Sequence, residues 1–115
     1  MADWDLEVDF LVVGSGAAGM SGALRAIDLD QDVLMVEASD LLGGSTAISG
    51  GVVWIPCNPQ LESRGIADSP EDALAYLRHI TQGRVSEARL QAYVTHSPRM
   101  VQWMESHTHF ALDSL

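Results

Sequence analysis

The sequence predicts an α/β fold built on a strand–helix–strand unit, and three observations support that prediction. First, an apolar run over residues 8–13 leads directly into three spaced glycines, Gly14, Gly16 and Gly19. Second, apolar residues recur at helical spacing between residues 17 and 29. Third, a second apolar run over residues 32–36 ends at the acid Glu37. Strand, glycine turn, helix, strand and acid in this order are typical of a dinucleotide-binding unit.

Each residue of this pattern has its own expected role. Gly14 allows the chain to turn sharply out of the strand, and Gly19 lets the helix pack close to it. Gly16 presents no side chain to an approaching pyrophosphate, and the helix start offers unpaired N–H groups and a partial positive charge. Glu37 would accept hydrogen bonds from ribose hydroxyls and repel a 2′-phosphate. The alternative is a glycine-rich turn of another α/β protein, in which Glu37 is a solvated acid.

A second glycine-rich segment follows the acid, over residues 38–51, and mixes glycines with hydroxyl side chains. Many backbone N–H groups and few obstructing side chains allow such a segment to wrap a flat heterocycle and its diphosphate linker. A flexible linker is the alternative. The apolar run of residues 52–56 argues against a linker, because the large side chain of Trp54 is expected to be packed.

The second half of the chain predicts helices with no strands between them. Ser69 and Pro70 form a helix start, with a capping hydroxyl and a proline in the first turn, and Gly83 ends that helix. Another helix starts at Ser86, and Pro98 either kinks it or restarts it. The apolar positions expected to face inward are Met20, Leu24 and Ile27 in the first helix of the chain, Ala73, Leu74, Leu77 and Ile80 in the next, and Leu90, Ala92, Tyr93, Val101, Trp103 and Met104 after it.

Composition and charge restrict the classes of function. The chain has 115 residues, of which 47% are hydrophobic, enough for one small domain with a buried core. Its formal net charge of -10 argues against nucleic acid and anionic membrane surfaces as partners. Glycines, serines and Arg25 between residues 8 and 27 exclude a membrane span there. The acidic residues 1–7 are unlike a secretory signal, and a single cysteine fits a reducing compartment, so a cytoplasmic location is expected.

Neither a metal site nor a catalytic group is predicted. The histidines lack helical pairing at four-residue spacing, and no carboxylate motif joins them. These histidines are His79, His96, His107 and His109. Tyr76 and Tyr93 lie on helical faces and are interpreted as packing residues. Cys57 has no basic residue near it, so a small loop residue is favoured over a reactive thiol.

Three segments taken together resemble a known group of flavoproteins. They are the strand and glycine turn of residues 9–19, the acid Glu37, and residues 43–56 with the letters GGSTAISGGVVWIP, the most specific of the three. They are similar to the N-terminal, FAD-binding end of the fumarate reductase/succinate dehydrogenase flavoprotein superfamily, and within it to the 3-oxosteroid 1-dehydrogenases. Weaker similarity continues through residues 69–73 and 76–77 to residues 97–100.

The resemblance implies FAD as the cofactor and implies which residues lie against it. Glu37 and Ala38 would bind the adenosine ribose. The pyrophosphate would be lined by Gly14, Ser15, Gly16, Ala17, Ala18 and Gly19. The segment beside the diphosphate and the isoalloxazine ring would contain Gly43, Gly44, Ser45, Thr46, Ser49, Gly50 and Gly51. The implied fold class is α/β, with part of a Rossmann-like FAD-binding domain in residues 1–58 and a helical segment in residues 59–115, incomplete relative to the family.

Members of this superfamily are several times longer and add a second FAD-contacting segment and a substrate domain. The sequence is therefore interpreted as the N-terminal piece of a flavin-dependent oxidoreductase that passes a hydride from a small-molecule substrate, a 3-ketosteroid in the steroid type, to flavin N5. Neither Tyr76 nor Tyr93 matches the family's catalytic tyrosines, so no catalytic residue is expected in this chain. The alternatives are a fumarate reductase-type flavoprotein and a free-standing FAD-binding module without its own catalysis. The sequence does not identify the electron acceptor.

Overall fold

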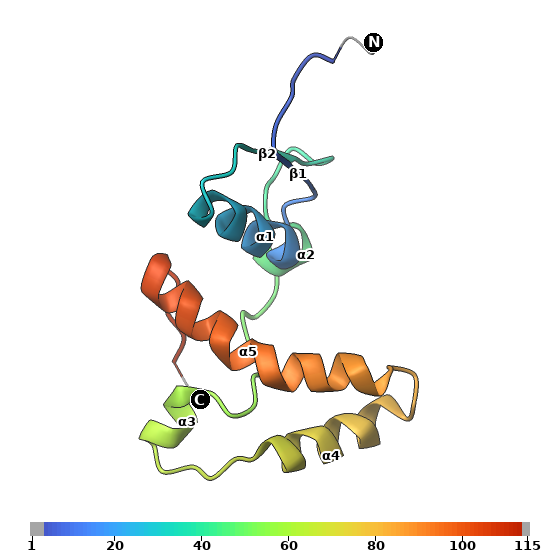
Figure 1. Ribbon diagram of the computed structural model, residues 1–115, viewed down its shortest axis with the longest axis vertical. Helices are drawn as coiled ribbons and strands as arrows, with labels where there is room; N and C mark the ends of the chain where they lie inside the picture. The colour runs from blue at the N-terminus through green and yellow to red at the C-terminus, as the bar shows by residue number, and fades with distance from the viewer. Residues whose placement is uncertain (1–3, 114–115) are drawn as a thin grey trace. The chain divides into compact units, whose positions relative to one another are not determined.

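The computed structural model describes residues 4–113, so the first three residues of the acidic start lie outside the described residues. The elements in chain order are β1 (Phe10–Val13), α1 (Ala17–Asp28), β2 (Val33–Val36), α2 (Gly44–Ala47), α3 (Pro59–Ser63), α4 (Pro70–Thr81) and α5 (Glu87–His107) (Figure 1). They form two compact units, which divide between Val52 and Val53. The combination of a parallel strand pair with helices confirms the α/β class.

The first unit is the expected strand–helix–strand unit. β1 and β2 pair in parallel, in a register that sets Phe10 opposite Val33 and Val13 opposite Val36. Parallel neighbours cannot be joined by a tight turn, and α1 makes the crossover and contacts both strands. The unit therefore places the end of β1, the start of α1 and the end of β2 at one edge of the sheet.

α1 buries its small residues. Ala23 and Ala26 are its buried side chains, whereas Met20 and Ile27, both expected to face inward, are 37% and 57% exposed. Leu24, the third residue expected to face inward, is partly buried, so the spacing was correct but the buried face is shifted toward Ala23 and Ala26. Alanines allow the helix to approach the strands closely, and a pair of strands is too narrow to cover the larger side chains at the flanks of the helix.

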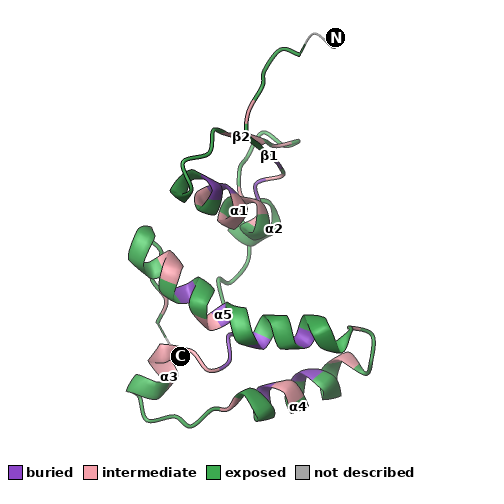
Figure 2. Cartoon of the chain, in the orientation of Figure 1, coloured by how far each residue is buried: buried purple, intermediate pink, exposed green. Residues whose placement is uncertain are grey.

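The second unit is built from helices. α4 and α5 lie side by side (Figure 1), and the residues buried between them appear in purple in Figure 2. The core cluster consists of Ala73, Leu77, Leu90 and Val94. Ser69 caps α4 as expected, since its hydroxyl accepts the N–H of Asp72 at 3.0 Å. The chain reverses after α4 through two left-handed residues, Gln82 with φ 48° and Gly83 with φ 76°.

The helical predictions for this unit hold in part. The buried positions among those expected to face inward are Ala73, Leu77, Leu90 and Val101. Ile80 is 51% exposed and Tyr93 41% exposed, and Ala92 is exposed, so these three expectations of inward-facing residues were wrong. α5 continues through Pro98 as one helix, so the helix does not restart there.

Residues 53–56 pack against the helices through Trp54. Its ring lies 5.3 Å from that of Tyr76 and stacks on that of Tyr93 at 6.1 Å, with an interplanar angle of 6°. The hydroxyl of Tyr93 donates to the carbonyl oxygen of Trp54, and Ile55 and Pro56 are buried. Trp54 is packed as expected, and both tyrosines serve as packing residues. These contacts belong to the helical unit, and the sequence-based domain boundary after residue 58 stays a prediction.

Candidate functional site

The glycine turn between β1 and α1 is shaped by Gly14 and Gly19. Gly14 has φ +94°, a conformation that side chains rarely allow, and its N–H donates to the carbonyl oxygen of Val36 at 2.8 Å. A Cβ atom at Gly19 would lie 2.0 Å from the carbonyl oxygen of Gly14. The fold itself therefore requires both glycines, one for the turn and one for the close approach of helix and strand.

Gly16 is not required by the fold in the same way. Its φ of -66° and ψ of 177° are open to any residue. A Cβ atom there would meet nothing nearer than the Oγ1 of Thr46, at 4.0 Å. The protein around Gly16 has room for a side chain, so the glycine leaves open space beside the start of α1.

The first turn of α1 presents backbone N–H groups to this space. The turn contains no acidic side chain, and Gly16 supplies no side-chain cap. Thr46 from the second glycine-rich segment accepts the N–H of Ala17 at 3.1 Å. Among the hydrogen bonds of residues 4–113, none engages the N–H of Gly16, Ala18 or Gly19. Free N–H groups at the positive end of a helix dipole form a site for an anion such as a phosphate.

Glu37 follows β2 and turns back toward the glycine turn. Its Oε2 accepts the N–H and the hydroxyl of Ser15 at 2.9 and 2.6 Å. Its Oε1 accepts the N–H groups of Ala38 and Ser39 at 2.8 and 3.1 Å. These hydrogen bonds, above all that from the Ser15 hydroxyl, lower the pKa of Glu37 to about 2, against the opposing effect of burial. Glu37 is therefore ionised at neutral pH and is held by the protein.

Ser15 links three segments of the unit. Its side chain is buried, with 1% of the residue exposed. Its hydroxyl donates to Glu37 and accepts the N–H of Gly43 at 2.8 Å. Because Glu37 also takes the backbone N–H, Ser15 presents neither group to a ligand in this structure. Its place in the turn is as expected, but its polar groups point into the protein.

The second glycine-rich segment is organised around the short helix α2. Gly43 and Gly44 are left-handed, with φ 107° and 51°. The hydroxyl of Ser49 donates to the carbonyl oxygen of Thr46 at 2.8 Å. A Cβ atom at Gly44 would lie 3.7 Å from the Cα of Gly16, so the segment returns to the glycine turn. Hydrogen bonds within the segment and to the turn distinguish it from a free linker.

Most of the expected cofactor residues are connected to one another. Direct contacts join Gly14, Ser15, Gly16, Ala17, Gly19, Glu37, Ala38, Gly43, Gly44 and Thr46, and hydrogen bonds extend this group to Ser49 and Gly51. The remaining three, Ala18, Ser45 and Gly50, are exposed. Sequence reasoning missed Ser39 as a partner of Glu37. A small hydroxyl residue shortly after a strand-end acid is a turn signal that could have pointed to it.

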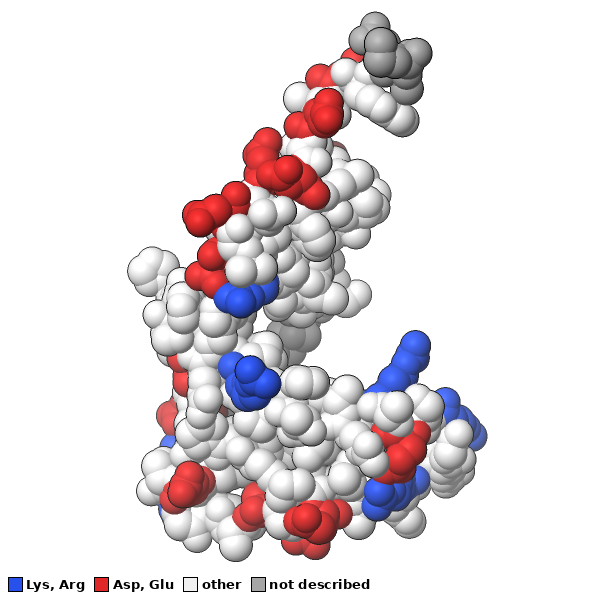
Figure 3. Space-filling model, viewed as in Figure 1, with Lys and Arg blue, Asp and Glu red and all other residues white. Residues whose placement is uncertain are grey.

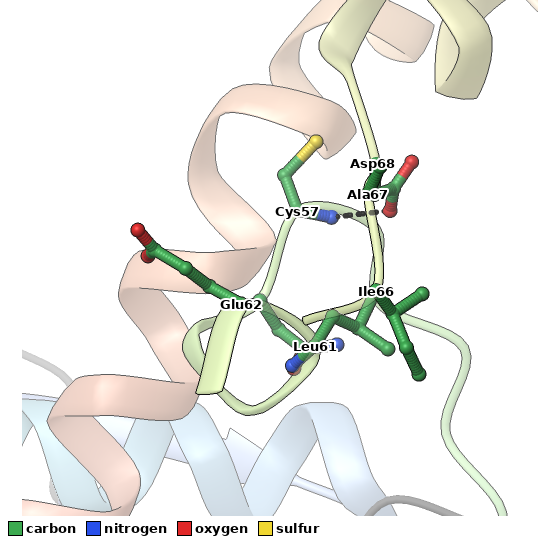
Figure 4. Close-up of a pocket in the computed structure, with 7 residues that line it drawn as sticks. Cys57, Leu61, Glu62, Ile66, Ala67 and Asp68 are labelled. Atoms are coloured by element: carbon green, nitrogen blue, oxygen red, sulfur yellow. Dashed lines mark hydrogen bonds between the residues drawn. The ribbon is translucent and has the colours of Figure 1, made fainter. Parts of the chain in front are cut away.

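The helical unit contains a depression beside Cys57, separate from the glycine turn (Figure 4). Its volume is about 280 Å³, and it is lined by Cys57, Asn58, Leu61, Glu62, Ile66, Ala67 and Asp68. The N–H of Cys57 donates to the carboxylate of Asp68 at 2.7 Å. Burial, and after it the charge of Asp68, raises the pKa of the Cys57 thiol. The thiolate is disfavoured, which agrees with the expectation that Cys57 is not reactive.

The face shown in Figure 3 reflects the negative net charge of the sequence. Acidic side chains are prominent on the face shown in Figure 3, and the basic ones are scattered. Within residues 4–113, no group of three or more His, Cys, Asp or Glu side chains is arranged to hold a metal ion. In the same range, no helix combines the length and the apolar character needed to cross a membrane.

Comparison with known proteins identifies relatives over most of the chain. The family model described as "FAD binding domain" matches residues 9–114. The 3-oxosteroid 1-dehydrogenase of Mycobacterium tuberculosis (strain ATCC 25618 / H37Rv) is 46% identical over 102 residues, which are 89% of this chain and 18% of that protein. The chain thus spans about a fifth of the length of the relatives that it matches.

Two solved structures have the same fold over most of the chain. The 3-ketosteroid delta1-dehydrogenase from Sterolibacterium denitrificans, in complex with 1,4-androstadiene-3,17-dione, matches with a TM-score of 0.79 and 50% identity, over 86% of this chain and 17% of that one. The 3-ketosteroid-delta4-(5alpha)-dehydrogenase from Rhodococcus jostii RHA1 matches with a TM-score of 0.83 and 28% identity, over 90% and 22%. The family match, these relatives and the glycine turn agree, and the chain belongs to the FAD binding domain family.

Proposed function

We propose that the first unit is a Rossmann-like FAD-binding βαβ unit and that the complete protein is a dehydrogenase of the 3-oxosteroid 1-dehydrogenase type. The observation that carries the cofactor site is Gly16, a glycine with room for a side chain and no conformational need to be glycine. It lies beside free N–H groups at the start of α1. The fold does not require glycine at position 16, but a pyrophosphate that approaches the backbone closely would require it.

The residues of the chain fit FAD in the following way. The N–H groups of Gly16, Ala18 and Gly19 face the pyrophosphate and neutralise part of its charge. Glu37 lies beside the adenosine ribose, and its negative charge disfavours a 2′-phosphate there. The residues proposed to lie along the diphosphate and the isoalloxazine ring are Gly43 to Thr46 and Ser49 to Gly51. Left-handed glycines in this second segment keep side chains away from a flat ring.

Bound FAD supplies the hydride acceptor of the reaction. The described residues bind and orient it, and we assign no acid or base of the reaction to them. We further propose that residues 1–58 form the cofactor-binding part, that residues 59–115 begin the remaining enzyme, and that the protein is cytoplasmic. The presence of a single cysteine in these 115 residues supports the location.

The substrate class is tested on the complete natural protein that contains this chain. The purified protein is expected to carry FAD and to reduce an artificial electron acceptor when a 3-ketosteroid is added. Product analysis then separates a new 1,2 double bond from a 4,5 double bond, the two outcomes suggested by the names of the relatives. Fumarate with a reduced dye is the control substrate. Turnover of fumarate alone would discard the steroid assignment and leave the FAD assignment standing.

A further inference from the structure

The Ser15 hydroxyl lies where the glycine turn, the end of β2 and the second glycine-rich segment meet. We propose that Ser15 is a positioning residue of the cofactor site, whose buried hydroxyl fixes the Glu37 carboxylate and the Gly43 N–H against the glycine turn before the cofactor binds. The inference rests on the proposed FAD site and deepens it. It assigns a function to a side chain that does not itself face the cofactor.

The Ser15 hydroxyl both donates and accepts a hydrogen bond. As a donor it reaches Oε2 of Glu37 at 2.6 Å, and as an acceptor it takes the N–H of Gly43 at 2.8 Å. Ser15 is 1% exposed, so water cannot substitute for either partner without a local opening of the structure. Removing the hydroxyl would leave a half-buried carboxylate oxygen and a partly buried N–H each short of a partner.

The carboxylate of Glu37 is held in one orientation as a result. A carboxylate offers about four acceptor positions, and four protein donors occupy them, two on each oxygen. The donors on Oε2 both come from buried Ser15, whereas those on Oε1 come from exposed Ala38 and Ser39. Oε1 is therefore the atom from which an incoming ribose hydroxyl can displace a partner. Fixing a group before binding lowers the entropy that the ligand must overcome.

The test compares two serines in the complete protein. Ser15→Ala removes the hydroxyl that touches Glu37. Ser63→Ala is the matched control, because the Ser63 hydroxyl is exposed in the helical unit and donates to the carbonyl oxygen of Gln60 at 2.8 Å. FAD affinity is measured by flavin fluorescence at pH 6 and at pH 4.5. We expect Ser15→Ala to weaken FAD binding roughly tenfold at pH 6 and Ser63→Ala to leave it unchanged.

The pH dependence separates positioning from loss of structure. Hydrogen bonds from Ser15, Ala38 and Ser39 are what lower the pKa of Glu37, and no charged side chain is among the causes. Without its largest contributor, the pKa rises from about 2 toward 4.5, so Glu37 in Ser15→Ala becomes partly protonated at pH 4.5. FAD affinity should then fall further between pH 6 and pH 4.5 in Ser15→Ala than in the wild type or in Ser63→Ala.

The outcomes distinguish the inference from the proposed function. A wild-type protein that binds no FAD overturns the proposed function. A wild-type protein that binds FAD, with Ser15→Ala equal to Ser63→Ala in affinity and pH profile, overturns the role of Ser15 alone. If Ser15→Ala does not fold, hydrogen exchange of the wild-type apoprotein decides. Protection of the Gly43 amide above that of the exposed Gly50 amide supports the inference, and equal exchange overturns it.

Discussion

Replacing Gly16 by valine separates what the fold needs from what the cofactor needs. The backbone there is extended, with φ -66° and ψ 177°, and a β-branched residue is well suited to it. A new Cβ would lie 4.0 Å from its nearest neighbour, which is ordinary contact. The apoprotein should therefore keep most of its stability and lose about 1 kcal/mol at most, because valine is a poorer N-cap residue than glycine but restricts the unfolded chain more.

The same substitution should damage cofactor binding. The valine side chain would occupy the open space beside the free N–H groups at the start of α1, where we place the pyrophosphate. A hydrogen bond to a charged group contributes about 1.5–3 kcal/mol. The loss of one such bond weakens binding roughly tenfold to a hundredfold, since each 1.4 kcal/mol is about a factor of ten. Clashes with the phosphates add to this loss.

Two other glycines provide the controls. Gly19→Ala would place a Cβ atom 2.0 Å from the carbonyl oxygen of Gly14, so this variant should lose stability and FAD together. Gly22→Ala would meet only the ring of Phe10, at 3.9 Å, and alanine favours a helix by up to about 1 kcal/mol over glycine. That variant should keep both properties. Thermal unfolding of the apoprotein and FAD titration are measured for all three variants.

Two results would refute the reasoning about Gly16. Gly16→Val that retains FAD at wild-type stoichiometry and affinity would show that no ligand approaches this backbone. Gly16→Val that is as unstable as Gly19→Ala would show that the fold, and not a ligand, requires the glycine.

Three further predictions concern charge, core and sheet. Because the pKa of Glu37 falls from 4.5 to about 2 on folding, its contribution to stability is complete above pH 4.5 and is lost as the pH falls to 2. The midpoint of urea unfolding should therefore drop more steeply between pH 4.5 and pH 2 in the wild type than in Glu37→Gln. Leu77→Ala should destabilise α4 by about 2–5 kcal/mol, whereas Ile80→Ala, at a 51% exposed position, should cost about 0.5 kcal/mol or less, as measured by hydrogen exchange of the α4 amides. Residues 1–115 expressed alone should self-associate, because Leu11 and Val13 on β1 are 56% and 80% exposed; a monomeric light-scattering mass with a sharp melting transition would contradict this.

The elements that the sequence predicts well are those with strong local signals. Gly14 and Gly19 predict the turn correctly because the observed backbone has no place for a side chain at either position. Ser69 and Pro70 predict the start of α4 at the observed residue. Periodicity was less informative about which face is buried. Periodicity favours large apolar side chains as the buried ones. α1 nevertheless packs through Ala23 and Ala26, because small side chains let a helix approach a pair of strands closely.

Contacts within the site depend on pairing that no local signal contains. Glu37 could be singled out as a strand-end acid, but its partner could not, because Ser15 precedes it by more than a helix and a strand. The same holds for the hydrogen bond from the Ala17 N–H to Thr46. A sequence pattern tells which residues gather at one sheet edge. It does not tell which of their atoms meet.

The register of the two strands explains why these atoms meet. Val13 lies opposite Val36, so both strands end level, and the next residues along the chains leave the sheet together. Beyond the paired strands, the N–H of Gly14 donates to the carbonyl oxygen of Val36. The next residue on each side is Ser15 or Glu37, and the hydroxyl of Ser15 donates to Glu37. A shift of one residue in the pairing would turn Glu37 to the opposite side of the sheet, away from the glycine turn. Glu37 can therefore serve the site only from its position directly after Val36. Moving the acid by one residue should weaken FAD binding as much as removing it.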